Sequence, residues 1–447
     1  LLQSTVAPML KLVNTSQISI DTIQLKKLIP TINTSLAERV AAVAMQIWPD
    51  SFAVKPGPGN KARWSYDQGV ILKGMEELWY ATGDPQYYQY VLHSMDYYVQ
   101  EDGTVRDYKP EEFNIDHLNN GKMLLTLFQV TGKEKYKKAL DLMYGQWKQH
   151  PRNNFGGLWH KKIYPNQMWL DGLYMGAAFM AQYSSVFHDT AAFNEITRQF
   201  VLAEEHTRDP QTGLLVHAWD AAKVQQWADP VTGKSPHVWG RAMGWYGMAL
   251  VDALDYYPVN HPGRDTLIQI LNRFAAAIVK VQNANGLWYD IIDAPKDPRN
   301  YFETSASSMM ARTLFKAVKN GFIAHHYLSN AQKAYAGLVD SAIQYNNGQF
   351  ELHNTVSVSG LGGNPYRDGT LDYYFKEPIV VNDPKGMGAF LQCAVQSYIF
   401  DKSNFTTNKT VTLDAYYNNE LKKDAKGTDY RWPVSYTHLT LPTIYSV

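Results

Sequence analysis

Two aspartates, Asp116 and Asp171, stand at the predicted starts of two helices, where carboxylates can perform acid–base chemistry. Asp171 follows Trp169 and precedes Gly172, so a flat apolar wall and a residue without a side chain flank it. Two carboxyl groups that share a site hold different pKa values, which lets one donate a proton while the other accepts one. The alternative is that each aspartate only caps backbone amides at a helix N-terminus, a contribution of about 1 kcal/mol.

Two long loops carry residues that could bind and orient a ligand. His160 and Lys161 precede Asp171 in one loop, and His217 lies in the next. A structural role is the alternative for each histidine. However, two histidines, a lysine pair and several tryptophans lie in loops that we expect at the same end of the fold, which favours a ligand-binding site. Neither histidine has the spaced His, Cys or carboxylate neighbours of a metal centre, so we expect no metal ion and no other cofactor.

A third segment places Arg241 between Trp239 and Trp245 at a predicted helix start. A buried guanidinium is costly unless it meets an anion, and its planar fork suits a carboxylate. The alternative is an ion pair with an aspartate of the core. The chain is also rich in aromatic residues, with 30 Tyr, 12 Trp and 17 Phe. Such side chains suit the faces of sugar rings, although packing in a helical core explains most of them.

Composition excludes several classes of protein. The 447 residues include 42 Lys and Arg against 42 Asp and Glu, so the net charge is zero and neither nucleic acid nor an anionic membrane surface is an expected partner. A chain with 45% apolar and 19% charged residues is not disordered. No glycine-rich phosphate loop, serine elbow, kinase or dinucleotide-binding motif is present, which disfavours nucleotide chemistry.

The sequence gives less information about the cellular compartment and the oligomeric state. Cys393 is the single cysteine, so no internal disulfide can form. No apolar run approaches the ~20 residues of a membrane-spanning helix. The chain begins Leu1-Leu2-Gln3, so we expect that any leader has been removed or was not included. The compartment stays open, with a periplasmic or secreted location favoured and a cytoplasmic one second, and the oligomeric state is not predicted.

Helical periodicity dominates from about residue 35 to residue 400, and the striped segments recur in pairs. Six hairpins, closed by pairing the first helix with the last, predict an all-α fold of six inner and six outer helices. Inner helices should be rich in small and apolar residues, and the long connections should gather at one mouth. The expected helices are 36–47, 67–80, 86–99, 116–130, 134–147, 171–186, 191–205, 239–256, 265–281, 303–318, 330–343 and 386–400.

We therefore expect three parts in the chain: an N-terminal extension over 1–34, a barrel domain over 35–400 and a C-terminal extension over 401–447. The C-terminal extension lacks the helical periodicity of the barrel domain. Its segment 435–443 resembles a vector-derived tail, and we assign it no function.

At these residues the sequence resembles glycoside hydrolase family 105, the unsaturated rhamnogalacturonyl hydrolases, and more distantly family 88, the unsaturated glucuronyl hydrolases. The matching segments are 167–175, 239–246 and 303–307, and the likeness spans roughly 35–400. The resemblance implies an (α/α)6 barrel, in agreement with the hairpin count. It implies that Asp171 is the catalytic acid and base and that Asp116 is its carboxylate partner. The substrate-contacting positions would be Tyr66 (a looser match), His160, Lys161, Trp169, His217, Trp239, Arg241 and Trp245.

The same resemblance implies the reaction. Enzymes of this family hydrate the C4=C5 double bond that a polysaccharide lyase leaves on a uronic acid, and the product opens and expels the next sugar. The expected substrate is an oligosaccharide, with pectic rhamnogalacturonan fragments as the first choice. One departure concerns Met243, which stands where the family often has asparagine, so a polar contact is lost.

Three other functions fit the same residues. An inverting glycosidase could use Asp116 and Asp171 on saturated sugars. A non-catalytic sugar-binding protein would need the aromatic residues and only the capping role of the aspartates. A purely structural helical scaffold would have no need of Arg241 at its mouth.

Overall fold

Capping residues mark the starts and ends of the helices, which lie close to the predicted boundaries. The computed structural model describes residues 35–54 and 62–405. Ser35 begins the first helix with a capping box, in which its hydroxyl accepts the N–H of Glu38 and the Glu38 carboxylate accepts the N–H of Ser35. Gly83 ends the next helix in the left-handed conformation, at φ 72°, and Asp84 caps the helix that follows.

The inner helices are buried on nearly all sides. Every residue of α9 is buried, whereas outer helices such as α10 bury one face. The inner set consists of α3 (Tyr66–Thr82), α5 (Gly121–Thr131), α7 (Ala178–Val186) with the preceding π-helical turn η5 (Leu173–Ala177), α9 (Gly240–Leu254), α11 (Thr304–Lys319) and α14 (Pro384–Phe405). The outer set consists of α2 (Leu36–Ile47), α4 (Pro85–Tyr98), α6 (Glu134–Gln149), α8 (Ala192–Thr207), α10 (Pro262–Lys280) and α12 (Leu328–Ala342).

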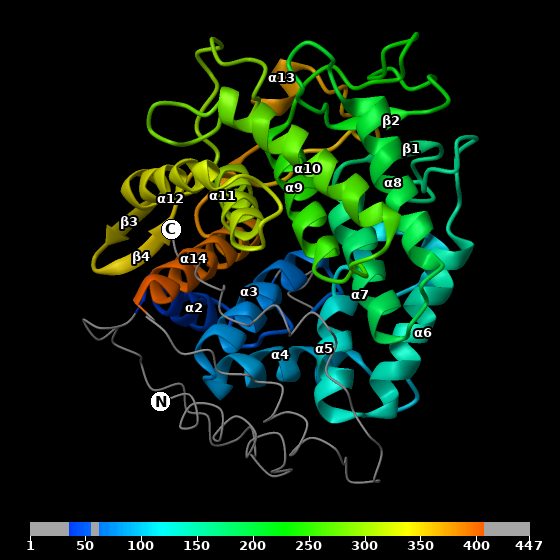
Figure 1. The fold of residues 1–447 in the computed structure, drawn as a ribbon, viewed down its shortest axis with the longest axis vertical. Coiled ribbons are helices and arrows are strands. Elements are labelled where there is room, and N and C mark those ends of the chain that lie inside the picture. The colour runs from blue at the N-terminus through cyan, green and yellow to red at the C-terminus, as the bar shows by residue number, and fades with distance from the viewer. Residues whose placement is uncertain (1–34, 55–61, 406–447) are drawn as a thin grey trace.

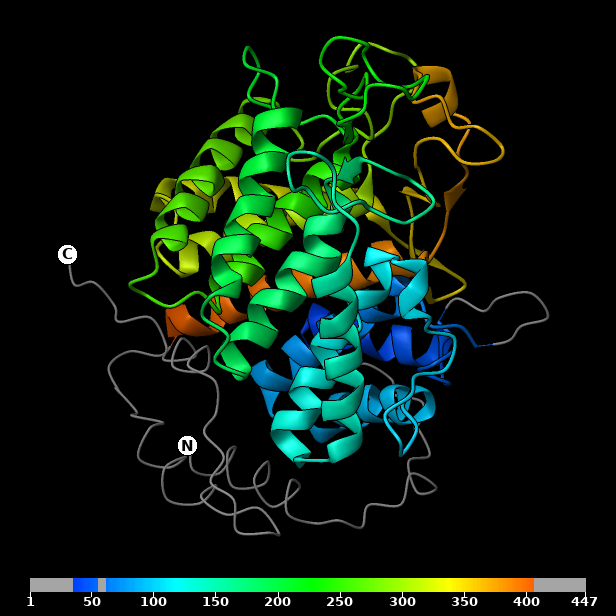
Figure 2. The same ribbon diagram turned by 90° about the vertical axis from the view of Figure 1, so that its right-hand side faces the viewer.

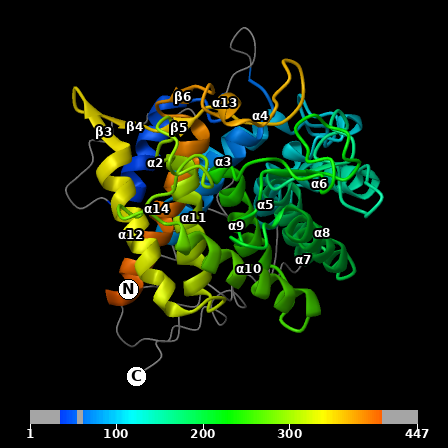
Figure 3. The ribbon, with the colours of Figure 1, turned by 90° about the horizontal axis from the view of Figure 1, so that it is seen from above.

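The inner helices form a closed ring. Each inner helix contacts the next in chain order, and α14 contacts both α11 and α3. Figure 1 and Figure 3 show α14 (orange) between α3 (blue) and α11 (yellow). A side chain at Gly388 of α14 would collide with the backbone of Val70 in α3, so this glycine permits the close approach that shuts the ring. Helix α2 packs on α14, as predicted, and the (α/α)6 barrel is confirmed.

The connections that lead into the inner helices contain the remaining elements, except η6, which precedes the outer helix α12. Figure 1 and Figure 2 show α13 among the green loops at the upper end of the molecule. Strands β1 and β2 pair antiparallel, as do β3 with β4 and β5 with β6. These elements are η3 (Pro110–Glu112), η4 (Ile115–Leu118), β1 (Gln167–Trp169), β2 (Ala218–Asp220), η6 (His325–Tyr327), β3 (Ile343–Asn346), β4 (Gln349–Leu352), β5 (Thr355–Val356), α13 (Leu371–Tyr374) and β6 (Ile379–Val380).

One predicted helix start is wrong. Asp116 does not open α5, because it lies in the separate 3-10 turn η4 and α5 begins only at Gly121. The side chain of Asn114 accepts the N–H of Asp116 and holds this turn. The side-chain amide of Asn119 then donates to the backbone of α3 at Tyr66, which competes with a continuous helix.

The ends of the chain are described only in part. Helix α14 continues to Phe405, a few residues beyond its predicted end. The N-terminal extension over 1–34 and residues 406–447 of the C-terminal extension lie outside the described residues. Within the described ranges no helix is long and apolar enough to span a membrane. Cys393 is buried in α14 as a free thiol.

Candidate active site

A two-stranded ribbon brings Asp171 next to His217. Strand β1 leads directly to Asp171, strand β2 follows His217, and Trp169 faces Ala218 in their register. The backbone N–H of Leu170 donates to the carbonyl of His217, 3.2 Å away. As a result, Asp171 Oδ2 lies 3.5 Å from His217 Nε2. Both atoms are buried, and neither has a hydrogen-bond partner among the described residues.

Tyr374 supports His217 from the other side. Its hydroxyl lies 2.8 Å from His217 Nδ1. Burial raises the pKa of Tyr374 well above its usual value, so the hydroxyl stays protonated and can donate a hydrogen bond to Nδ1. When the tyrosine donates, Nδ1 is the acceptor and the proton of the neutral imidazole lies on Nε2, which faces Asp171.

The second carboxylate, Asp116, lies beside an ammonium group and an imidazole. Lys161 Nζ lies 2.7 Å from Asp116 Oδ2, and His160 Nε2 lies 3.4 Å from Oδ1. Burial alone would raise the pKa of Asp116, but the charge of Lys161 and its hydrogen bond to the carboxylate hold the pKa below its usual value. Burial lowers the pKa of His160 to about 4, so this imidazole is neutral near pH 7. Asp116 is therefore ionised beside an ammonium group.

Tyr66 shows that the charged groups share one environment. Burial raises the pKa of its hydroxyl well above the usual value. The negative charges of Asp67, Asp116 and Asp171 raise it further, whereas Arg241 acts in the opposite direction. The charges of Asp116, Asp171 and Arg241 thus all act on the hydroxyl of this half-buried tyrosine.

Arg241 is anchored by the protein itself. Its Nη2 lies 3.3 Å from Glu303 Oε1 and also donates to the carbonyl of Val356, while Nε donates to the hydroxyl of Ser305 over 2.7 Å. Nη1 donates to the carbonyl of Ser357 over 3.2 Å. The arginine is thus in an ion pair, but with a glutamate rather than with the aspartate that the sequence suggested. Four of its five N–H groups are used, which leaves one on Nη1.

The predicted tryptophans form walls around the polar groups. Trp169 stacks on His160 with ring centroids 4.5 Å apart and meets His217 edge-on at 5.4 Å. Trp239 packs on His217 at 4.6 Å. Trp245 packs against Tyr174 and Tyr66. These tryptophans are at most 6% exposed, and Trp169 and Trp239 fix the imidazoles and exclude water from them.

Two functional candidates were not predicted from the sequence. Tyr374 lies in a long connection that carries no periodic signal, far from His217 in the chain. Asp290 accepts a hydrogen bond from Trp239 Nε1 over 3.1 Å. Burial and the charge of Glu303 raise the pKa of Asp290 to about 8, so it is largely protonated near pH 7. The local sequence Trp-Tyr-Asp, which ends at Asp290, contains no motif whose spacing indicates a partner for this carboxyl group.

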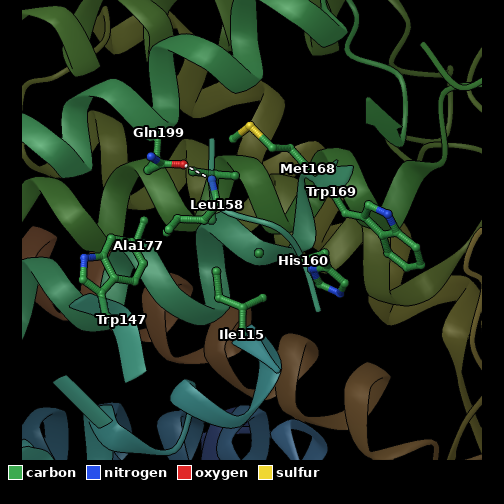
Figure 4. A pocket seen from close by; sticks show the side chains of 10 residues that line it. Ile115, Trp147, Leu158, His160, Met168, Trp169, Ala177 and Gln199 are labelled. Carbon is green, nitrogen blue, oxygen red and sulfur yellow. Dashed lines mark hydrogen bonds between the residues drawn. The ribbon is translucent and has the colours of Figure 1, made fainter. Parts of the chain in front are cut away.

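A small cavity lies behind the ribbon. In Figure 4, His160 and Trp169 form one side of it and Trp147 and Ala177 the other. Gln199 is uncharged, and its side-chain oxygen accepts a hydrogen bond from the N–H of Leu158 over 2.9 Å. The lining is mainly apolar, so the cavity suits neither a charged sugar nor a metal ion. Within 35–54 and 62–405, no group of three His, Cys, Asp or Glu side chains could hold a metal ion.

Comparison with known proteins identifies the family of the chain. The model of Glycosyl Hydrolase Family 88 matches residues 37–400. A glycoside hydrolase of family 105 from C. acetobutylicum is 42% identical, with a TM-score of 0.77 over 82% of this chain and 99% of that one. The unsaturated rhamnogalacturonyl hydrolase YesR of Bacillus subtilis is 30% identical over 62% of this chain and 76% of its own length.

A more distant structure shares the fold. The unsaturated glucuronyl hydrolase of Bacillus sp. GL1, responsible for the degradation of glycosaminoglycan, superposes with a TM-score of 0.59 over 81% of this chain and 94% of its own, at 13% identity. The family match covers most of the chain. The chain therefore belongs to the family 88 and family 105 group of glycoside hydrolases, the unsaturated uronyl hydrolases.

Proposed function

We propose that this protein removes a 4,5-unsaturated uronic acid from the non-reducing end of lyase-generated oligosaccharides, with rhamnogalacturonan fragments as the first substrate to test. The observation that carries the proposal is the pair Asp171 Oδ2 and His217 Nε2, which face each other at 3.5 Å without a hydrogen bond. Buried polar atoms without partners are costly unless a ligand satisfies them. The proposal is also supported by the ion pair of Asp116 with Lys161 and by the charges of Asp116, Asp171 and Arg241, which all act on the hydroxyl of Tyr66.

Asp171 is the acid and then the base in this proposal. Its carboxyl group donates a proton to C4 of the unsaturated sugar, and the positive charge that develops is shared between C5 and the ring oxygen. The resulting carboxylate then accepts a proton from water as the water oxygen bonds to C5, so the catalyst is regenerated. The C5 hemiketal opens, and the bond to the next sugar breaks. Nε2–H of His217 can hold the Asp171 carboxylate in place during both steps.

Asp116 and Arg241 supply charge around the sugar. Asp116 stays ionised because of Lys161 and can stabilise the positive charge that develops at C5. Arg241 can direct its remaining Nη1 N–H to the uronate carboxylate. The buried ion pair with Glu303 fixes the guanidinium, so little motion is needed on binding.

The near-ultraviolet absorbance of the unsaturated uronate gives a direct test. Adding enzyme to lyase digests of pectic rhamnogalacturonan, glycosaminoglycan or ulvan should abolish this absorbance in at least one of them. Asp171→Asn should lower kcat by about 10²–10⁴-fold, because a carboxamide cannot deliver the proton. Absorbance that persists in all digests, with sugar release from substrates that no lyase has treated, would show an ordinary inverting glycosidase instead.

A further inference from the structure

Asp290 lies in the connection that leads from α10 to α11, and its backbone is fixed against the start of α9. Its N–H donates to the carbonyl of Tyr301 over 2.9 Å, and its carbonyl accepts the N–H of Gly240 over 2.7 Å. A Cβ atom at Gly240 would lie 2.7 Å from the carbonyl oxygen of Tyr289, so the glycine permits this close approach. The side chain of Asp290 is therefore placed by main-chain contacts on both sides.

This side chain holds the indole of Trp239. Asp290 Oδ1 accepts a hydrogen bond from Trp239 Nε1 over 3.1 Å. The indole packs on His217 with ring centroids 4.6 Å apart, and Cζ of Arg241 lies 5.4 Å from the centroid of the same indole. Asp290 thus fixes the aromatic ring that contacts both the imidazole beside Asp171 and the predicted arginine.

The carboxyl group of Asp290 is buried without a cation in contact among the described residues. Its side chain has no exposed surface, and Oδ2 has no hydrogen-bond partner in that part of the chain. The charge of Arg241 reaches this carboxyl group, but the guanidinium already lies 3.3 Å from Glu303 Oε1. An ionised Asp290 would place a second carboxylate against one guanidinium in the interior, which is costly. The neutral acid keeps the hydrogen bond to Trp239 and avoids that charge.

The surroundings of Asp290 oppose its ionisation. The titratable and charged groups that interact with it from neighbouring elements are Arg241, Tyr301, Glu303, Tyr374 and Glu377. Burial has the largest effect and the charge of Glu303 the next, and together they raise the pKa of Asp290 to about 8, whereas the charge of Arg241 lowers it less strongly. Burial also raises the pKa of Tyr301 and of Tyr374, so both hydroxyls stay protonated and add no charge.

A charge on Asp290 would reach the sugar through Arg241. In the proposed function, the remaining Nη1 N–H of Arg241 meets the uronate carboxylate. While Asp290 is neutral, the charges of Arg241 and Glu303 cancel each other. Once Asp290 is ionised, the three groups carry a net negative charge, which repels the uronate in a medium of low dielectric constant.

We propose that Asp290 is a positioning residue that holds Trp239 as a neutral acid, and that its ionisation sets an alkaline limit to the binding of the uronate. This inference rests on the proposed function, because it places the uronate carboxylate at Arg241. Asp290 acts through Trp239 and Arg241 and is not a group that contacts the reacting atoms.

Asp290→Asn tests the alkaline limit, because a carboxamide fills the same space, accepts the indole N–H and stays neutral at every pH. The quantity to follow is kcat/KM of this variant divided by that of the wild type, since the titration of Asp171 is common to both and cancels. The ratio should be near one at pH 6 and about tenfold at pH 9, because about a tenth of the carboxyl groups stay neutral one pH unit above the pKa. The change should lie in KM. A ratio that does not vary with pH would overturn the proposal.

Asp293→Asn is the matched control in the same connection. Asp293 accepts the N–H of Val238 over 2.8 Å and lies 3.0 Å from His237 Nδ1, so its carboxylate has partners of its own. The same ratio for this variant should stay constant from pH 6 to pH 9. A rise equal to that of Asp290→Asn would show that any lost carboxylate in this connection has the effect, which contradicts the assignment.

Two further variants test the contact with the indole. Asp290→Leu removes the acceptor and should lower kcat/KM at pH 6 about tenfold below that of Asp290→Asn, because Trp239 loses its anchor. Trp239→Phe removes the donor and leaves the carboxyl group in place. The alkaline limit should then move to higher pH, because the indole N–H no longer stabilises the carboxylate. A limit that stays where it is in Trp239→Phe would show that Asp290 does not act through Trp239.

The melting temperature tests the neutral state of Asp290 without any ligand. The pKa of Asp290 is about 8 in the folded chain and about 4 in the unfolded one, so the unfolded chain alone releases this proton between these values. The wild type should therefore lose stability relative to Asp290→Asn as the pH rises from about 4 to about 8. A constant difference in melting temperature over this range would show that Asp290 is ionised throughout.

Failure of the proposed function has a different signature. In that case the wild type turns over none of the lyase digests, and the dissociation constant of an unsaturated uronate disaccharide, measured by calorimetry, replaces kcat/KM. Weaker binding at pH 9 than at pH 6 in the wild type, but not in Asp290→Asn, would still support the inference. The same pH dependence in both proteins, or no binding at either pH, would reject it.

Discussion

Buried charges gather at two places in the ring, and they are used differently. At the mouth, Asp171 Oδ2 faces only an imidazole, at 3.5 Å. Farther along the inner helices lies a floor cluster, made of Glu77, Asp252, Arg312 and Lys316. There Arg312 Nη2 contacts Glu77 and lies 2.8 Å from Asp252, and Lys316 Nζ lies 2.6 Å from Asp252.

The pKa values reflect this difference. In the floor cluster, burial would raise the pKa of Asp252, yet the charges of Arg312 and Lys316 hold it far below its usual value. At the mouth, burial dominates at Asp290, whose pKa rises to about 8. The carboxylates of the floor cluster contact cations and hold three inner helices together, whereas neither Asp171 nor Asp290 is in an ion pair with a lysine or arginine among the described residues. Burial alone does not distinguish structural from chemical carboxylates in this fold.

The largest effect is expected when the floor cluster loses its arginine. Arg312→Met should lower the free energy of unfolding by about 3–5 kcal/mol, because Glu77 and Asp252 would keep their buried charges without this partner. Denaturant unfolding measures the change. Lys137→Met is the control, since it removes an exposed pair with Asp141 on α6 and should cost at most about 0.5 kcal/mol. Equal losses in the two variants would contradict the comparison.

A smaller effect is expected when the mouth loses the hydroxyl of Tyr374. Tyr374→Phe should reduce kcat about tenfold with little change in KM. Nδ1 of His217 would no longer accept a hydrogen bond from this hydroxyl, and the tautomer with its proton on Nε2, toward Asp171, would be less favoured. The pH profile of kcat should also change. Tyr144→Phe, which removes a hydroxyl bound to Asp189 on the outer layer, provides the comparison. Identical pH profiles for wild type and Tyr374→Phe would show that Tyr374 only fills space.

The smallest effect concerns the cation beside Asp116. In the wild type Lys161 keeps the pKa of Asp116 low, so the stability that this ionisation contributes is present above about pH 4 and is lost as the pH falls through the lower folded value. Lys161→Gln leaves burial less opposed, and the pKa of Asp116 rises. The acidic limb of the pH profile of kcat/KM should move upward by about one unit.

Lys162→Gln is the neighbouring control for this variant, because Lys162 reaches the backbone of Glu111 and contacts neither aspartate. Its acidic limb should coincide with that of the wild type. A limb that moves in Lys162→Gln, or stays in place in Lys161→Gln, would mean that Asp116 does not set the acidic limit.

The sequence predicted the helices well because their signals are local. Gly83 and Asp84 mark a stop and a start that the backbone reproduces, and apolar periodicity separates inner from outer helices. Asp116 was misplaced because the competing bonds of Asn119 reach a helix distant in the chain. The partner of Arg241 and the role of Tyr374 also depend on contacts between distant segments, which no local pattern records.

The placement of α14 between α3 and α11 has a consequence for biosynthesis. The flanks of α3 and α11 that α14 covers stay open until the final helix of the ring has left the ribosome, so the barrel cannot be completed while its earlier helices emerge. We expect cooperative folding only after Phe405 has emerged, with the unfinished ring dependent on chaperones for protection from aggregation. Nascent chains that stop before Pro384 should accordingly be captured by chaperones more strongly than chains that extend past Phe405.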